Sequence, residues 1–98
     1  MDALFLSRDQ IFLWNGQKAA ANRAKHGMGF EMDCEAFFDD FAVYVDATDG
    51  EESRNAVIGL SRARSLLYVV HVECEEDDIR IISAREATNR ERNIYEDG

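Results

Sequence analysis

The chain is organised around residues 80–95, RIISAREATNRERNIY, which join its clearest strand pattern to its clearest helix start. Residues 79–84 are short and rich in β-branched side chains, and they follow the acidic turn of residues 75–78, so they predict a buried strand after a hairpin. Thr88 and Glu91 have the spacing of a capping box, in which each side chain accepts from the other's backbone N–H. The sequence therefore predicts a strand that ends about four residues before a helix begins.

The composition predicts a single domain that spans residues 1–98. A chain of 98 residues with 46% hydrophobic residues can bury one core. Cys34 and Cys74 lie far apart and lack the spacing of zinc ligands, so we expect reduced thiols, no metal and no cofactor. The apolar residues 4–6 are followed by polar residues 8–10, too early for a signal peptide or a membrane span. We therefore expect a cytoplasmic protein with no membrane contact.

The net charge of −9 argues against a uniformly cationic surface for nucleic acid. The charge is unevenly distributed, because acids concentrate in residues 31–52 and 73–78. Seven arginines fall in the later half of the chain: Arg54, Arg62, Arg64, Arg80, Arg85, Arg90 and Arg92. These arginines form either a folded basic patch or scattered solvated charges, and composition leaves both alternatives open.

The first third of the chain predicts a strand followed by a helix. Residues 1–10 have no clear period and are either an N-terminal extension or an added edge strand. Residues 11–14 predict a compact strand, and residues 18–26 predict an alanine-rich helix that Gly27 ends. Four polar residues share one face of that helix by their spacing: Lys18, Asn22, Lys25 and His26. His26 is either part of a site or a cation that complements the helix dipole.

A second helix is predicted over residues 30–39. Its apolar positions recur at helical spacing and predict a stripe that faces the core: Phe30, Cys34, Phe37, Phe38 and Phe41. Its opposite face carries acids that we expect to point to solvent and not to bind a metal: Glu31, Asp33, Glu35 and Asp39.

Four strands are predicted in the remainder, over residues 42–46, 56–60, 66–73 and 79–84. The last two links are five residues each, which favours successive antiparallel hairpins. The predicted fold is α+β, with a twisted antiparallel sheet, two N-terminal helices and one C-terminal helix.

Several pieces of sequence, in their order and spacing, resemble one known family. They lie between Phe12 and Tyr95: Trp14, Lys18-Ala19, Asn22, Lys25-His26-Gly27, Phe30, Arg54, Gly59, Leu66-Leu67, His71, Arg80 to Arg85, Ala87-Thr88, Glu91-Arg92 and Tyr95. In these residues the chain resembles the BrnT toxins of bacterial type II toxin–antitoxin systems. The resemblance implies a RelE-like fold and a metal-independent endoribonuclease that cleaves RNA and inhibits translation.

The same resemblance implies the partners. A ribbon-helix-helix antitoxin, similar to BrnA, would bind the toxin in a complex with two copies of each chain. DNA would be contacted only through that antitoxin, and RNA would be the substrate.

The chain also departs from the family pattern at two positions. Ser53 separates Glu52 from Arg54, where the family usually places an acid directly before the arginine, and Ser65 replaces a basic residue that is common before the Leu-Leu pair. These departures favour an alternative, a catalytically weakened or inactive binding module that acts with its antitoxin in transcriptional autorepression.

Metal-free RNA cleavage requires a base for the ribose hydroxyl proton, cations for the charged phosphorane, and an acid for the leaving oxygen. His26, His71 or Glu52 could be the base, and His26 ranks first because histidine titrates nearest neutral pH. Arginine binds phosphate oxygens with two planar donors and stays charged. The candidate catalytic residues are Lys25, His26, Arg54, Arg80 and Arg85. The candidate substrate-binding residues are Lys18, Glu52, His71, Arg92 and Tyr95.

Several of these candidates also have a structural interpretation. Arg80 and Arg85 are an odd number apart, so strand alternation predicts that they face opposite sides of the sheet unless Arg85 lies past the strand end. His71 sits in an apolar strand, where a hydrogen-bonded core histidine is the more common outcome. Trp14 and Tyr95 could stack on bases, but packing is more common for both.

Overall fold

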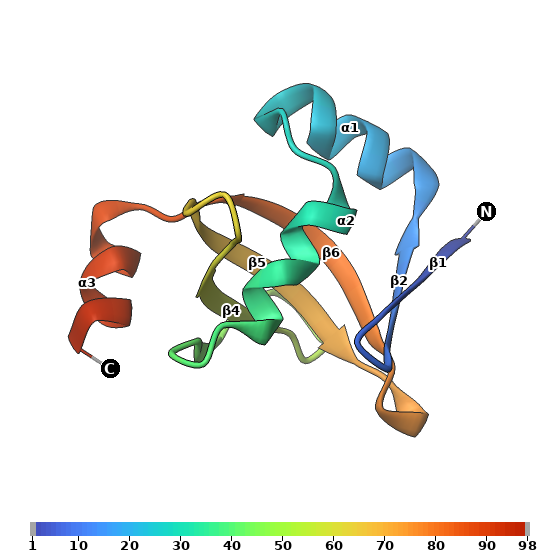
Figure 1. Cartoon of the computed structure of the whole chain (residues 1–98). Coiled ribbons are helices and arrows are strands. Elements are labelled where there is room, and N and C mark those ends of the chain that lie inside the picture. The colour runs from blue at the N-terminus through green and yellow to red at the C-terminus, as the bar shows by residue number, and fades with distance from the viewer. Residues whose placement is uncertain (1, 98) are drawn as a thin grey trace.

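Residues 2–97 are described by the computed structural model, in which a short helical segment covers one face of an open sheet and the last helix stands off one end of it (Figure 1). The elements are β1 (Asp2–Ser7), β2 (Gln10–Asn15), α1 (Gly16–His26), α2 (Phe30–Asp33), the 3₁₀ helix η1 (Cys34–Phe38), β3 (Val43–Asp46), β4 (Asn55–Leu60), β5 (Leu66–Glu73), the 3₁₀ turn η2 (Glu75–Asp77), β6 (Ile79–Glu86) and α3 (Asn89–Asp97). The strand order is β1-β2-β6-β5-β4-β3. The α+β class is therefore confirmed.

Local sequence signals located most elements correctly. The strand predicted over residues 66–73 is β5, and residues 2–7 form the added edge strand β1. The capping box is present, because the Glu91 N–H donates to Thr88 Oγ1 at 3.2 Å and the Thr88 N–H donates to Glu91 Oε1 at 2.9 Å. Gly27 ends α1 with a left-handed φ of 84°. β6 runs two residues further than predicted, to Glu86, so Arg85 lies within the strand.

The sheet is mixed, and the prediction of a purely antiparallel sheet is wrong. β2 pairs with β6 in parallel, with Phe12 opposite Ile79 and Leu13 opposite Arg80. The other strand pairs are antiparallel. The prediction considered only strands joined by short links, whereas β2 and β6 are brought together by the whole intervening fold.

The predicted second helix is also corrected. The α-helix ends at Asp33 and the chain continues as the 3₁₀ helix η1, which has about three residues per turn and rotates the later side chains relative to an α-helix. Phe30 and Cys34 are buried as predicted, but Phe41 lies past η1 and is 76% exposed. Asp33, expected on the solvent face, is fully buried.

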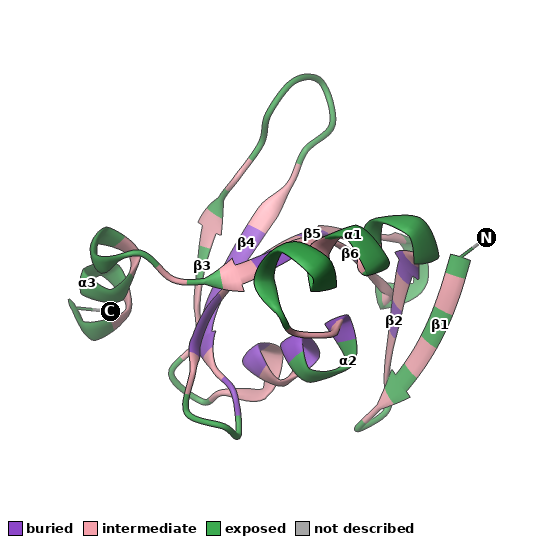
Figure 2. Cartoon of the chain, turned by 90° about the horizontal axis from the view of Figure 1, so that it is seen from above, coloured by how far each residue is buried: buried purple, intermediate pink, exposed green. Residues whose placement is uncertain are grey.

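The core lies between the α2–η1 segment and the sheet, where the buried residues in Figure 2 gather. Phe12 packs on Phe37 with ring centroids 5.3 Å apart. Gly59 on β4 allows η1 to approach the sheet closely, because a Cβ at this position would lie only 2.3 Å from the carbonyl oxygen of Ala36. Because Gly59 has no side chain, η1 can lie this close to β4.

We predict that Gly59→Ala destabilises the fold by about 1–3 kcal/mol, because the added methyl group must push the backbone of η1 away from β4. Urea unfolding measures this change. Gly50→Ala is the control, since a Cβ there meets nothing within 4 Å, although its φ of 89° adds a local strain. Equal losses in the two variants would show that the layer contact at Gly59 is not limiting.

Asp33 is a buried carboxylic acid at the end of α2. It is 0% exposed, and neither carboxylate oxygen has a hydrogen-bond partner among residues 2–97. Burial, and to a smaller degree the neighbouring carboxylates of Glu31 and Glu35, raise the pKa of Asp33 to about 6. The folded protein therefore binds this proton more tightly than the unfolded chain does.

We predict that Asp33→Asn stabilises the protein at about pH 8 by up to about 3 kcal/mol, the equivalent of the pKa shift. The cost of ionising buried Asp33 is absent below the unfolded pKa near 4 and complete above about 6, so the gain should vanish at about pH 4. Urea unfolding at the two pH values measures it, with exposed Asp49→Asn as the control. A gain of the same size at both pH values would contradict the assigned cause.

Candidate functional site

A groove lies between α1 and the second half of β6. β2 pairs with β6 only up to Leu13 and continues as α1, so α1 takes the place of a strand beside the rest of β6. There the Ala84 N–H donates to Asn22 Oδ1 at 3.1 Å, which replaces a bond of the sheet. The groove therefore follows from the topology. After β2 the chain continues as α1, and the side chains of α1 face the edge of β6 that no strand covers.

Both ends of α1 are fixed by local sequence. Asn15 caps the start by accepting from the Lys18 N–H at 3.1 Å, and the Gly27 N–H donates to the Arg23 carbonyl at 2.7 Å. The helix therefore presents residues 18, 21, 22, 25 and 26 to β6 as one face. The groove has a volume of about 420 Å³ and is lined by Lys18, Ala21, Asn22, Lys25, His26, Ile82, Ser83, Ala84 and Arg85.

The charge of this groove is opposite to that of the chain. Its described lining contains Lys18, Lys25 and Arg85 together with His26, and it includes no acid. The whole chain has a net charge of −9, so this is a local concentration of positive charge on an acidic protein. The seven arginines of the later half do not gather into one basic patch here, because within residues 2–97 Arg85 alone of the seven lines this groove.

Arg85 is held in a fixed orientation. Its guanidinium lies over the ring of Tyr68, 4.3 Å from the centroid, and binds both carboxylate oxygens of Glu91 at 2.7 and 2.9 Å. Hydrogen bonding between the two side chains raises the pKa of Arg85 and lowers the pKa of Glu91. Arg85 stays charged and ordered, while Glu91 balances part of its charge.

A β-bulge puts Arg80 and Arg85 on the same face of the sheet. The bulge leaves Ile82 without an opposite residue on β5, which shifts the alternation of side chains by one. Arg80 is opposite Val72 and Arg85 is opposite Tyr68, and these two β5 residues are an even number apart. The prediction of opposite faces is therefore wrong, because strand alternation held only on each side of the bulge.

Arg54 and Arg80 do not line the groove. Arg80 donates to the Asp2 carboxylate at 2.7 Å and connects β6 to β1. Arg54 precedes β4 and donates to Glu52 at 3.3 Å. Of the arginines proposed as catalytic residues, the structure brings Arg85 alone to Lys18, Lys25 and His26 within residues 2–97.

His71 and Tyr95 take structural positions. His71 is fully buried against Phe37, with ring centroids 4.8 Å apart, and burial lowers its pKa. It is a core residue and cannot contact a substrate in this structure. The Tyr95 hydroxyl donates to Asp39 Oδ2 at 2.6 Å, and burial together with this bond raises the pKa of Tyr95 to about 12. Arg92 is exposed on α3 and does not line the groove.

Sequence reasoning missed Ser83 and Tyr68, and it missed the role of Asn22. Asn22 was recognised on the polar face of α1, but its bond to β6 required the tertiary structure. Ser83 follows the bulge and Tyr68 stacks on Arg85, and both positions depend on the β5–β6 register. The i, i+4 spacing from Lys18 to Asn22 was the one signal available.

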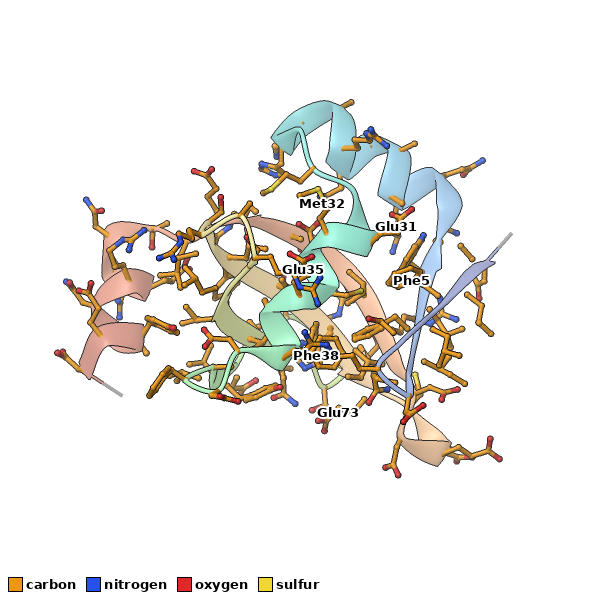
Figure 3. The ribbon with its side chains drawn as sticks, viewed as in Figure 1. Phe5, Glu31, Met32, Glu35, Phe38 and Glu73 are labelled. Atoms are coloured by element: carbon orange, nitrogen blue, oxygen red, sulfur yellow. The ribbon has the colours of Figure 1, made fainter. Side chains whose placement is uncertain are left out.

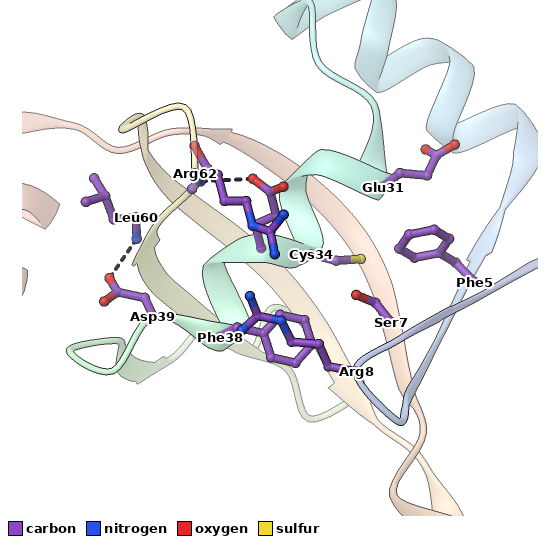
Figure 4. Close-up of a pocket in the computed structure, with 11 residues that line it drawn as sticks. Phe5, Ser7, Arg8, Glu31, Cys34, Phe38, Asp39, Leu60 and Arg62 are labelled. Carbon is purple, nitrogen blue, oxygen red and sulfur yellow. Dashed lines mark hydrogen bonds between the residues drawn. The ribbon is translucent and has the colours of Figure 1, made fainter.

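A second cleft, of about 290 Å³, lies between the β1–β2 hairpin and the α2–η1 segment (Figure 4). Figure 3 shows Phe5 and Phe38 on this side of the molecule, with Glu31 and Glu35 along the helical segment. Arg8 stacks on Phe38 at 5.0 Å, and the Arg62 N–H donates to Glu35 at 2.9 Å. The lining has two arginines and three carboxylates, which suits a phosphate less well than the α1–β6 groove does.

Neither a metal cluster nor a membrane helix is found in the described chain. Residues 2–97 contain no group of three or more His, Cys, Asp or Glu side chains placed to hold a metal ion. No helix in the same range is long and apolar enough to cross a membrane.

Comparison with known families gives one match. A family model described as the ribonuclease toxin, BrnT, of type II toxin–antitoxin systems matches residues 14–91, which include α1, β6 and the start of α3. A comparison with curated proteins gives no match.

We predict that Arg85→Ala lowers the free energy of unfolding by about 1–2 kcal/mol, because Glu91 and Tyr68 lose their shared partner. A double-mutant cycle with Glu91→Ala should give a coupling of about 1 kcal/mol. Arg80→Ala is the control and should leave stability nearly unchanged, because its bond to Asp2 is at the surface. Additive effects of Arg85→Ala and Glu91→Ala would contradict the tether between β6 and α3.

Proposed function

The chain belongs to the BrnT family of ribonuclease toxins of type II toxin–antitoxin systems, and on this premise we propose that the α1–β6 groove is where it cleaves RNA. The observation that supports this site most strongly is the concentration of Lys18, Lys25 and Arg85 beside His26 on a chain of net charge −9. Cationic side chains attract the phosphodiester, and a histidine beside them can transfer protons.

The residues of the groove divide the chemistry among them. His26 accepts the proton of the ribose 2′-hydroxyl, whose oxygen then attacks the phosphorus. Lys25 and Arg85 stabilise the negative charge of the phosphorane, and Lys18 holds a neighbouring phosphate. The bond from phosphorus to the 5′-oxygen breaks, and that oxygen takes a proton from a protonated side chain or from water. The products are a 2′,3′-cyclic phosphate and a free 5′-hydroxyl.

Inhibition of translation and control by an antitoxin complete the proposed function. A type II toxin has a protein antitoxin, and we infer that this one is a ribbon-helix-helix protein similar to BrnA. Ribbon-helix-helix domains are dimeric, so a complex with two copies of each chain follows, with DNA contacted through the antitoxin. We further propose a RelE-like arrangement of the fold and action in the cytoplasm, where messenger RNA is translated.

One observation favours a second candidate function. Glu91 already binds two donors of Arg85, so the most ordered cation of the groove is partly neutralised within the chain. A chain weakened in this way would keep the toxin fold and act with its antitoxin as a binding module in transcriptional autorepression. The cleavage assay below separates this alternative from the nuclease.

We predict that the purified chain, freed of antitoxin, cleaves RNA in the presence of EDTA. His26→Ala should lower the cleavage rate about 100-fold, as expected for loss of general acid–base catalysis. Lys25→Ala should lower it about tenfold or more by removing a cation from the phosphorane. Both side chains are exposed, so neither change should alter the melting temperature. Gel analysis of a labelled RNA, with and without EDTA, gives the rates.

Arg23→Ala is the matched control, because Arg23 is an exposed cation of the same helix that does not line the groove. Its cleavage rate should equal that of the unchanged chain. Activity that EDTA abolishes and magnesium restores would overturn the metal-independent mechanism. No cleavage of free RNA or of RNA on translating ribosomes, with antitoxin binding intact, would establish the binding-module alternative.

A further inference from the structure

A mainly apolar groove lies at the opposite edge of the sheet from β1. It has a volume of about 530 Å³ and is formed by the link between η1 and β3 and by the end of α3, and its lining is Asp40, Phe41, Ala42, Val43, Tyr95 and Glu96. Figure 2 shows α3 standing off this edge of the sheet. The groove shares no residue with the proposed RNA site.

Apolar side chains are exposed in and beside this groove. Phe41, in the lining, is 76% exposed, and Ile94, next to the lining residue Tyr95 on α3, is 39% exposed. Helical spacing predicted that Phe41 would lie in the core, and the change to a 3₁₀ helix turns it outward instead. Exposed apolar residues beside an apolar hollow are typical of a surface that another protein covers.

The backbone at this edge is also available. β3 is the last strand of the sheet, and no other strand of residues 2–97 pairs with its outer side. An extended segment of a partner can therefore add to β3 by main-chain hydrogen bonds while one of its side chains enters the groove.

The charge of the lining selects the kind of partner. Among the described lining residues the charged ones are both acids, Asp40 and Glu96. These carboxylates repel the phosphates of RNA. They also disfavour a second copy of this chain, whose net charge is −9. A protein segment that has lysines or arginines beside an apolar residue fits this surface. Its apolar residue can enter the groove, and its basic residues can pair with the two carboxylates.

We propose that this groove docks the antitoxin, through an extended antitoxin segment in which an apolar side chain is flanked by lysine or arginine. Phe41 and Tyr95 contact the apolar side chain, and Asp40 and Glu96 contact its basic neighbours. The proposal rests on the proposed function in one respect, the naming of the partner as an antitoxin. It places antitoxin capture on a surface separate from the cationic groove.

The test uses the full chain and the product of the reading frame adjacent to its gene, with affinity measured by isothermal titration calorimetry. Phe41→Ser should weaken binding about thirtyfold, a typical loss for a central aromatic anchor. Glu96→Lys should weaken binding and make it less sensitive to salt, since one of the two carboxylates that attract the basic partner residues is replaced by a like charge. RNA cleavage by each variant alone should equal that of the unchanged chain.

Leu4→Ser is the matched control, because Leu4 is 67% exposed on β1 at the other edge of the sheet. Its affinity should not change. Unchanged binding by Phe41→Ser, equal losses in Phe41→Ser and Leu4→Ser, or no binding by the unchanged chain would overturn the docking surface. Cleavage is scored separately, so a chain that cuts no RNA but loses its partner through Phe41→Ser would contradict the nuclease and support the docking surface.

Discussion

The close approach of η1 to β4 at Gly59 is the contact on which the rest of the structure depends. With the Ala36 carbonyl against a residue that has no Cβ, η1 lies low enough for Phe37 to reach Phe12 and His71 across the sheet. The chain then leaves η1 at Asp39, whose carboxylate accepts from the Leu60 N–H at 2.8 Å and from the Tyr95 hydroxyl. Gly59 thus permits the close approach of the two layers, and Asp39 connects the end of η1 to β4 and α3.

Interactions within a few residues were readable from the sequence, and those between distant segments were not. The Thr88–Glu91 capping box and the Gly27 helix end depend on neighbouring atoms and were predicted correctly. The parallel β2–β6 pair joins residues nearly 70 positions apart, and no local pattern indicates it. The change from α-helix to 3₁₀ helix in residues 30–38 was likewise not predicted, and this segment contacts Gly59, a residue outside it.

The candidate site was predicted only in part, because spacing along one helix can be derived from the sequence and contacts between distant segments cannot. Spacing on one helix placed Lys18, Lys25 and His26 together, because a helix has a fixed period. Arg54 and Arg80 were chosen by residue type, which cannot show that Glu52 and Asp2 already bind them. The net charge likewise described an average, whereas the fold separates a cationic groove beside α1 from acidic surfaces elsewhere.

The edge strand β1 also affects how the protein behaves in concentrated solution. Its residues 3–7 contain no charge and no proline, and Leu4 and Leu6 are 67% and 63% exposed. Such an edge is a template on which further chains can stack as strands, and its charged residues, Asp2, Arg8 and Asp9, lie only at its two ends. Electrostatic repulsion between copies of net charge −9 is then what keeps this edge apart. The solubility of the folded chain therefore depends on its acidic surface as a whole. Acid or high salt weakens the repulsion and should cause aggregation that begins at β1.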